Sequence, residues 1–182
     1  MKRSFGCLAA FLSALLALCL TGCGAGSTGP VRAGAPASGI RPPGSETDHA
    51  QLYFVTPLGL QSVTREVPEP ASPQQALDLL LKGPDAGERA RGLTTEVPPF
   101  HGPLVARAAE GAVDVRLPVP VSAMPPSGGL GLSQIVCTAA NARLPGGKQP
   151  PDVTVRIHEP GYRTPWTVRC DAAGDVVPVS GR

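Results

Sequence analysis

The chain has 182 residues, of which 42% are apolar and only 4% aromatic, so it has room for one ordinary domain with an aliphatic core. Its 16 Lys and Arg residues nearly balance 14 Asp and Glu residues, which gives a formal net charge of +2. This balance excludes the strongly basic surface that is typical of nucleic-acid-binding proteins, and no nucleic acid is expected as a partner.

The first 22 residues have the features of an export signal. Lys2 and Arg3 supply a positive start, and the apolar run over 7–20 is too short to span a membrane comfortably. The sequence Leu20-Thr21-Gly22-Cys23 resembles the bacterial lipobox, which directs cleavage before a lipid-modified cysteine. We therefore expect a signal peptide over 1–22 and a diacylated Cys23 that holds the chain on the outer face of the cytoplasmic membrane. The alternative is an unprocessed amino-terminal anchor.

Cleavage before Cys23 would remove two of the 16 basic residues and none of the 14 acidic ones, leaving 14 of each. The mature chain is then formally neutral, and we expect no local Lys/Arg cluster in it. The segment that follows is mostly Gly, Ala, Ser and Pro. We expect residues 23–48 to be the lipidated cysteine and a disordered tether, which as a flexible coil spans on the order of 25–30 Å.

Two β-rich segments and a helix open the part that is expected to fold. Residues 51–55 are rich in β-forming side chains, and residues 63–67 alternate between apolar and polar types. Ser72-Pro73-Gln74-Gln75 is a capping-box start with proline at the first helical position, and apolar residues at helical spacing continue from it. Gly83 and Pro84 end this helix, and a polar connection runs on through Arg91.

A hairpin, a second helix and two more strands follow. Segments 104–109 and 112–117 flank the tight turn Glu110-Gly111. After a Pro/Gly-rich loop, apolar residues spaced by three and four predict a helix from Leu130 to near Arg143. The alternation over 153–158, and the shorter segment 166–170, predict the last strands.

This element order predicts an α+β fold: a single domain with an antiparallel sheet and two helices packed on one face. The domain is expected to cover residues 49–172, and residues 173–182 are expected to be a C-terminal tail. The second face of the sheet is expected to be exposed to water.

Six segments fall in the order typical of the GerMN domain, and residues 50–158 resemble a single GerMN module. The segments are Leu52-Tyr53-Phe54-Val55, Val63-Thr64-Arg65-Glu66-Val67, Ala76-Leu77-Asp78-Leu79-Leu80-Leu81-Lys82-Gly83-Pro84, Gly92-Leu93-Thr94-Thr95, Val113-Asp114-Val115 and Ser133-Gln134-Ile135-Val136-Cys137-Thr138. The resemblance implies a non-catalytic binding or assembly domain of the kind found in sporulation and germination lipoproteins and in actinobacterial envelope lipoproteins. The Ala, Gly, Pro and Arg content also suggests an actinobacterial origin. Cys137 departs from the family, in which an aromatic residue is common at this position.

Two cysteines remain once the signal is removed and Cys23 is lipidated. Cys137 and Cys170 would then lie in an oxidising compartment, where we expect a disulfide between the second helix and the last strand. The alternative is a small core residue at Cys137 and a free thiol at Cys170.

No catalytic, cofactor or metal site is expected. His49, His101 and His158 lack ligand-like spacing, and no Gly-x-Ser-x-Gly motif or phosphate-binding loop occurs. Glu110 and Asp114 are close in sequence, but they fall on a turn and an outward strand position, so an enzyme is not expected.

The best candidate site is the polar face of the predicted sheet. Its expected residues are Asp114, Arg116, Arg156, His158 and Arg169, with Thr154 and Thr167 beside them. They form either a docking surface for an envelope protein or simply the solvated side of the sheet. Strand addition at an exposed sheet edge is another route to a protein partner. A different class of function is the binding of a small ligand or cell-wall glycan through the 118–132 loop.

Overall fold

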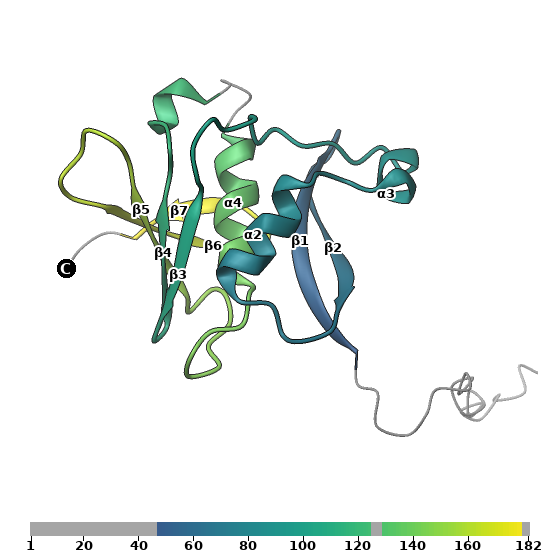
Figure 1. The fold of residues 1–182 in the computed structure, drawn as a ribbon, viewed down its shortest axis with the longest axis horizontal. Helices are drawn as coiled ribbons and strands as arrows, with labels where there is room; N and C mark the ends of the chain where they lie inside the picture. Colours follow the sequence, from purple (N-terminus) through teal and green to yellow (C-terminus); the bar gives the residue numbers. More distant parts are fainter. Residues whose placement is uncertain (1–46, 125–128, 180–182) are drawn as a thin grey trace, which may run out of the picture. The chain divides into compact units, whose positions relative to one another are not determined.

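The computed structural model describes residues 47–124 and 129–179, which belong to one compact unit over Ser45–Arg182 (Figure 1). The predicted signal peptide (1–22), Cys23 and the tether up to residue 46 lie outside the described residues. The elements in chain order are β1 (Asp48–Thr56), β2 (Gly59–Val67), α2 (Pro73–Leu81), α3 (Ala86–Ala90), β3 (Val105–Ala109), β4 (Ala112–Arg116), η1 (Val121–Ala123), α4 (Leu130–Ala140), β5 (Thr154–His158), β6 (Trp166–Cys170) and β7 (Val176–Pro178).

The strands form two separate sheets, and the fold is broadly α+β. Strands β1 and β2 make a two-stranded antiparallel sheet, and the other sheet has the order β3-β4-β5-β6-β7. The prediction of one antiparallel sheet is wrong at β4 and β5, which run parallel. The reason is that η1 and α4 lie between these strands in the chain, so the connection is a crossover, whereas a short hairpin turn would make them antiparallel.

Helix α4 lies between the two sheets (Figure 1) and contacts β1 and β2 as well as β4, β5, β6 and β7. All ten residues over 131–140 are buried. The sequence of α4 permits this because it has no charged residue and is rich in small and apolar side chains. The helix is therefore the centre of the core.

Two polar side chains of α4 bind the backbone of β1. Gln134 donates from Nε2 to the carbonyl oxygen of Tyr53 at 2.8 Å and accepts at Oε1 from the Glu96 N–H at 2.7 Å. Thr138 Oγ1 accepts from the Tyr53 N–H at 3.1 Å. Because unpaired polar groups are costly in a core, these bonds compensate for the burial of both side chains and cover one edge of β1.

The predicted first helix is confirmed as α2, which begins with the expected capping box at Ser72 and Gln75. Gln74 of this helix binds the edge of β3. Gln74 donates from Nε2 to the carbonyl oxygen of Leu104 at 3.1 Å and accepts at Oε1 from the Ala106 N–H at 2.7 Å. A side-chain amide thus occupies the place of a further strand next to β3.

Helix α3 lies in a segment that was predicted to be a polar connection. Asp85 and Glu88 form a reciprocal capping box, which is the signal that was missed. Glu88 is buried and pairs with Arg65 of β2, whose guanidinium also donates to the Gly83 carbonyl at 2.8 Å and lies 5.3 Å from the Phe54 ring centroid. This contact joins the β1-β2 sheet to the region after α2.

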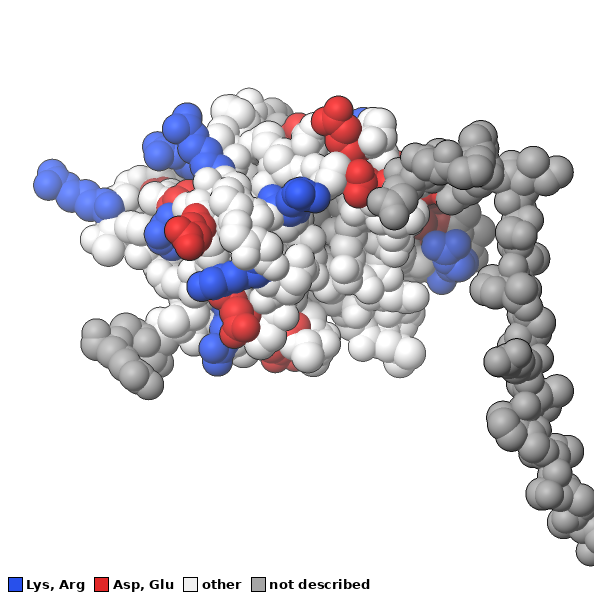
Figure 2. Space-filling model, turned by 90° about the horizontal axis from the view of Figure 1, so that it is seen from below, with Lys and Arg blue, Asp and Glu red and all other residues white. Residues whose placement is uncertain are grey.

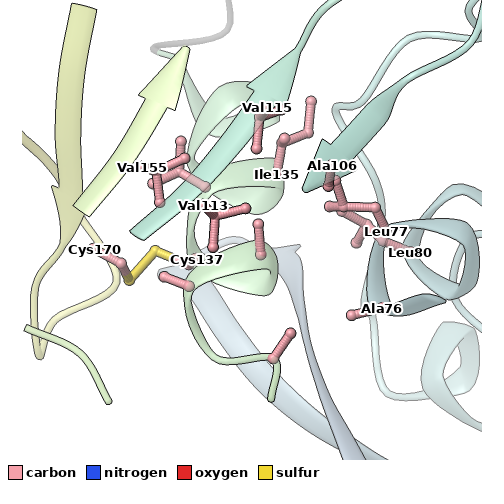
Figure 3. Packing of buried hydrophobic residues seen from close by; sticks show 14 of the residues in the cluster. Ala76, Leu77, Leu80, Ala106, Val113, Val115, Ile135, Cys137, Val155 and Cys170 are labelled. Carbon is pink, nitrogen blue, oxygen red and sulfur yellow. A yellow bond between two sulfur atoms is a disulfide. The ribbon is translucent and has the colours of Figure 1, made fainter. Parts of the chain in front are cut away.

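The five-stranded sheet packs against α4 through aliphatic side chains, and a disulfide joins the two elements. Figure 3 shows Val113, Val115 and Val155 pointing toward the helix near Ile135. Cys137 of α4 and Cys170 of β6 are bonded, with an S–S distance of 2.06 Å. Beyond Cys170, residues 176–178 pair with β6 as β7, although the sequence analysis assigned them to the tail.

The tight packing of α4 predicts the effect of one substitution. An alanine Cβ at Gly131 would lie 2.5 Å from the carbonyl oxygen of Glu96 and 3.3 Å from Met124 Cε. We expect Gly131→Ala to lower the free energy of unfolding by about 1–3 kcal/mol, measured by urea denaturation, because the backbone must shift to relieve the clash.

The matched control is Gly87→Ala in α3, where the new Cβ would meet Asp85 Oδ1 at an ordinary 3.4 Å. This change should leave stability unchanged or raise it slightly, since alanine is the better helix former. Equal stabilities of Gly131→Ala and the unsubstituted protein would contradict the close approach of the Glu96 segment to α4.

Candidate functional site

The side chains of the five-stranded sheet alternate between a buried face toward α4 and a second, polar face. Val113, Val115, Val155, Ile157 and Val168 are fully buried on the first face. The residues between them point the opposite way, as the pleat of a strand requires. We call this second face the arginine face; its members are Arg107, Asp114, Arg116, Thr154, Arg156, His158, Thr167 and Arg169.

The parallel pairing of β4 and β5 brings four of the predicted site residues together. Asp114 lies opposite Arg156, and Arg116 lies opposite His158. Arg169 lies on β6, two positions along from Thr167, which is opposite Arg156. The structure therefore places all five predicted partner-face residues on one face of the sheet.

Asp114 is held by two neighbours on β5. Arg156 approaches its carboxylate through two nitrogens: Nε donates to Oδ1 at 2.8 Å, and Nη2 pairs with Oδ2. His158 Nε2 also lies 2.8 Å from Oδ1, and since an ionised carboxylate only accepts hydrogen bonds, this ring nitrogen carries the hydrogen. Both oxygens of Asp114 are thus occupied within the sheet.

These contacts stabilise the ionised form of Asp114. The hydrogen bonds from Arg156 act most strongly, burial opposes them, and the His158 contact adds to them, so the pKa of Asp114 falls from 3.8 to about 2. The same carboxylate raises the pKa of Arg156 above its usual value. Asp114 is consequently a fixed negative charge at ordinary pH.

Arg107 belongs to the same site, although it is not among the predicted site residues. It lies on β3 directly opposite Asp114. With Val105, Asp114, Arg116 and His158 it lines a hollow of about 470 Å³ on the arginine face. The Glu110-Gly111 turn was predicted correctly, and a two-residue turn sets the register of a hairpin, so the pairing of Arg107 with Asp114 could have been derived from the sequence.

The arginine face corrects the expectation that the mature chain has no Lys/Arg cluster. Four arginines share this face with a single carboxylate, Asp114. They come from separate strands, so no basic run appears in the sequence. Viewed from below, the domain shows basic and acidic residues mixed on a mostly uncharged surface, several of them side by side (Figure 2).

The 118–132 loop, the alternative ligand site, is described at both ends but not over 125–128. Glu159 binds its first part: Oε2 accepts from the Val121 N–H at 2.6 Å, and Oε1 accepts from Trp166 Nε1 at 2.6 Å. Within the described residues this loop contributes no lining residue to the hollow beside Arg107.

The three histidines do not form a site together. His49 lies at the start of β1 beside a hollow of about 810 Å³, His101 lies in the connection before β3, and His158 contacts Asp114. Among residues 47–124 and 129–179, no group of three His, Cys, Asp or Glu side chains is placed to hold a metal ion. In the same part of the chain, no helix has the length and apolar character needed to cross a membrane.

Comparisons of the chain with protein-family models, with curated proteins and with solved structures find no match. The properties of the candidate site are therefore inferred from the residues of the arginine face alone.

The low pKa of Asp114 predicts how stability depends on pH. A carboxyl whose pKa is lowered by folding adds stability above its unfolded pKa of 3.8, and this contribution is lost as the pH falls through about 2. The side chains of Arg156 and Asp114 are 39% and 31% exposed, so solvent screening reduces the effect. We expect Asp114→Asn to cost about 1 kcal/mol at pH 7, and the difference to disappear as the pH falls from 4 to 2.

The measurement is urea denaturation at several pH values, with Asp152→Asn as the control because Asp152 is an exposed carboxyl on a turn. The control should not alter stability at either end of this range. If the free energy of unfolding of Asp114→Asn stays lower than that of the unsubstituted protein by the same amount down to pH 2, the ion-paired state of Asp114 is contradicted.

Proposed function

We propose that this protein is a lipid-anchored, extracytoplasmic lipoprotein whose single domain docks an envelope protein through the arginine face. The observation that carries the proposal is an ordered polar surface, fixed by Asp114, Arg156 and His158, on the side of the sheet away from α4. Partner-binding surfaces gain specificity from charges that are held in place before binding.

The proposal includes the arrangement of the helices, with α2 and α4 covering the same face of the five-stranded sheet. Its support is that α4 contacts β4 to β7 and that α2 contacts β3. With both helices on that side, the whole width of the arginine face stays accessible to a partner.

The membrane anchor in this proposal is the lipid on Cys23, and its support is the lipobox-like sequence Leu20-Thr21-Gly22-Cys23. Two acyl chains give stable attachment where a single chain gives only marginal attachment. The first strand begins at Asp48, so about 25 residues separate the anchor from the domain, enough to hold it clear of the lipid headgroups.

The proposed role is non-catalytic, in binding, assembly or regulation at the outer face of the cytoplasmic membrane, as the GerMN resemblance implies. The order of the GerMN-like segments supports it, since they lie on β1, β2, α2, β4 and α4 and on the link before β3. A protein partner is favoured over a small ligand because the arginine face is broad and the hollow on it has charged walls.

The anchor predicts the mass of the membrane-extracted protein. The mature chain should begin at a diacylated Cys23, and alkylation should detect two further thiols, Cys137 and Cys170, only after reduction. Cys23→Ala should remain unlipidated with its signal uncleaved. An unmodified Cys23 in the membrane fraction, or alkylation without reduction, would contradict the anchor or the disulfide respectively.

The docking surface predicts where a partner can be crosslinked in intact cells. A photo-reactive amino acid at Thr167, which lies on the arginine face opposite Arg156, should give a discrete heavier adduct with another envelope protein. The same amino acid at Ser62, exposed on β2, should not give that adduct. Equal labelling from both positions, or no adduct from Thr167, would count against the arginine face as the docking surface.

A further inference from the structure

The arginine face carries one arginine on each of four adjacent strands. Arg107 is on β3, Arg116 on β4, Arg156 on β5 and Arg169 on β6. Neighbouring strands lie about 4.8 Å apart, so the row crosses the sheet over about 14 Å. The row is staggered along the strands: Arg107 and Arg156 are level with Asp114, whereas Arg116 lies two residues to one side of that level and Arg169 two residues to the other.

Three of the four arginines have no partner among the described residues. Arg156 is paired with Asp114, and the same carboxylate also contacts His158. The side chains of Arg107, Arg116 and Arg169 are exposed and make no hydrogen bond or ion pair within the part of the chain that the structure describes. Asp114 is close to Arg107 but is already engaged, so positive charge is left over on this face.

The free arginines are spread over the face and are not evenly spaced. Arg107 and Arg116 are diagonal neighbours across β3 and β4, whereas Arg169 lies two strands beyond Arg116 and four residues away along the strand direction. A partner that contacts all three must therefore present carboxylates over a patch about 14 Å wide.

We propose that the arginine face binds an acidic segment of a protein, laid across strands β3 to β6. The inference rests on the proposed function and names the chemistry of its partner. Carboxylates pair with Arg107, Arg116 and Arg169, since a guanidinium can donate two parallel hydrogen bonds to one carboxylate. The hollow between Arg107 and Arg116, with Val105 at its wall, receives one acidic side chain together with its methylene groups.

A narrow protein segment fits this surface better than a membrane or a nucleic acid. The described charges on the arginine face are four arginines and one carboxylate, and Asp114 lies in the middle of the row. The chain as a whole carries little net charge, so attraction acts only at short range. A broad polyanion would lie against the neutral and acidic surface around the row as well.

The test is fluorescence anisotropy with the full chain in neutral detergent and a labelled peptide rich in Glu and Ser. We expect saturable binding that weakens when ionic strength rises above about 0.1 M. The double variant Arg107→Glu, Arg116→Glu should weaken binding at least about tenfold, which corresponds to about 1.4 kcal/mol. Both side chains are exposed, so circular dichroism should show an unchanged fold.

The matched control is Arg91→Glu with Arg143→Glu, which changes the net charge equally at two exposed arginines outside the five-stranded sheet. It should bind the peptide as the unsubstituted protein does. A peptide of the same length with Gln in place of every Glu should bind more weakly. Equal losses in both double variants, or equal binding of both peptides, would overturn the proposal.

Two further outcomes separate this inference from the docking function. If Thr167 still crosslinks an envelope protein but no acidic peptide binds, the acidic partner is wrong while the arginine face remains the docking surface. If vesicles containing anionic lipid bind in an Arg107- and Arg116-dependent way and the peptide does not, the occupant is the membrane and the proposal fails.

Discussion

The fold depends on the burial of α4 over residues 131–140. A helix enclosed by one sheet on each side has no exposed face for charged residues, and it needs small side chains where the backbone of a neighbour comes close. Gly131 meets the second requirement against Glu96, and Gln134 and Thr138 are tolerated because backbone groups of Tyr53 and Glu96 bind them. Helix α4 is therefore joined to β1 by hydrogen bonds as well as by apolar contact.

The position of α4 also determines which face of the five-stranded sheet is exposed. Because one face of the five-stranded sheet packs on α4, the alternate residues of β3 to β6 must point the other way, and four of them are arginines. Asp114 anchors one arginine and leaves the others free. The disulfide between Cys137 and Cys170 links α4 to β6, the strand that carries Arg169. It therefore restricts the movement of this strand relative to the core.

Local patterns in the sequence predicted most elements, while contacts between distant segments were beyond it. The capping box at Ser72, the Glu110-Gly111 turn and the alternation on β5 are signals within a few residues, and each element lies where it was expected. The parallel pairing of β4 and β5 depends on the direction in which the chain re-enters the sheet after the crossover. No pattern within a few residues predicts that direction. Buried Glu88 was missed because its partner, Arg65, is 23 positions away. Three arginines of the row were predicted on one face of the sheet, and only Arg107 was missed, although the hairpin register places it opposite Asp114.

The last strand affects how the sheet edges of two copies of this domain can meet. The Val179 N–H donates to the Thr167 carbonyl, and Val177 lies opposite Arg169. Pro178 lies between these two positions, so its backbone nitrogen points away from β6 toward the free edge of the sheet. A proline nitrogen has no hydrogen to donate to an incoming strand. At the opposite edge, the Gln74 amide occupies backbone groups of β3. Both edges of the five-stranded sheet thus disfavour the addition of a strand from another chain.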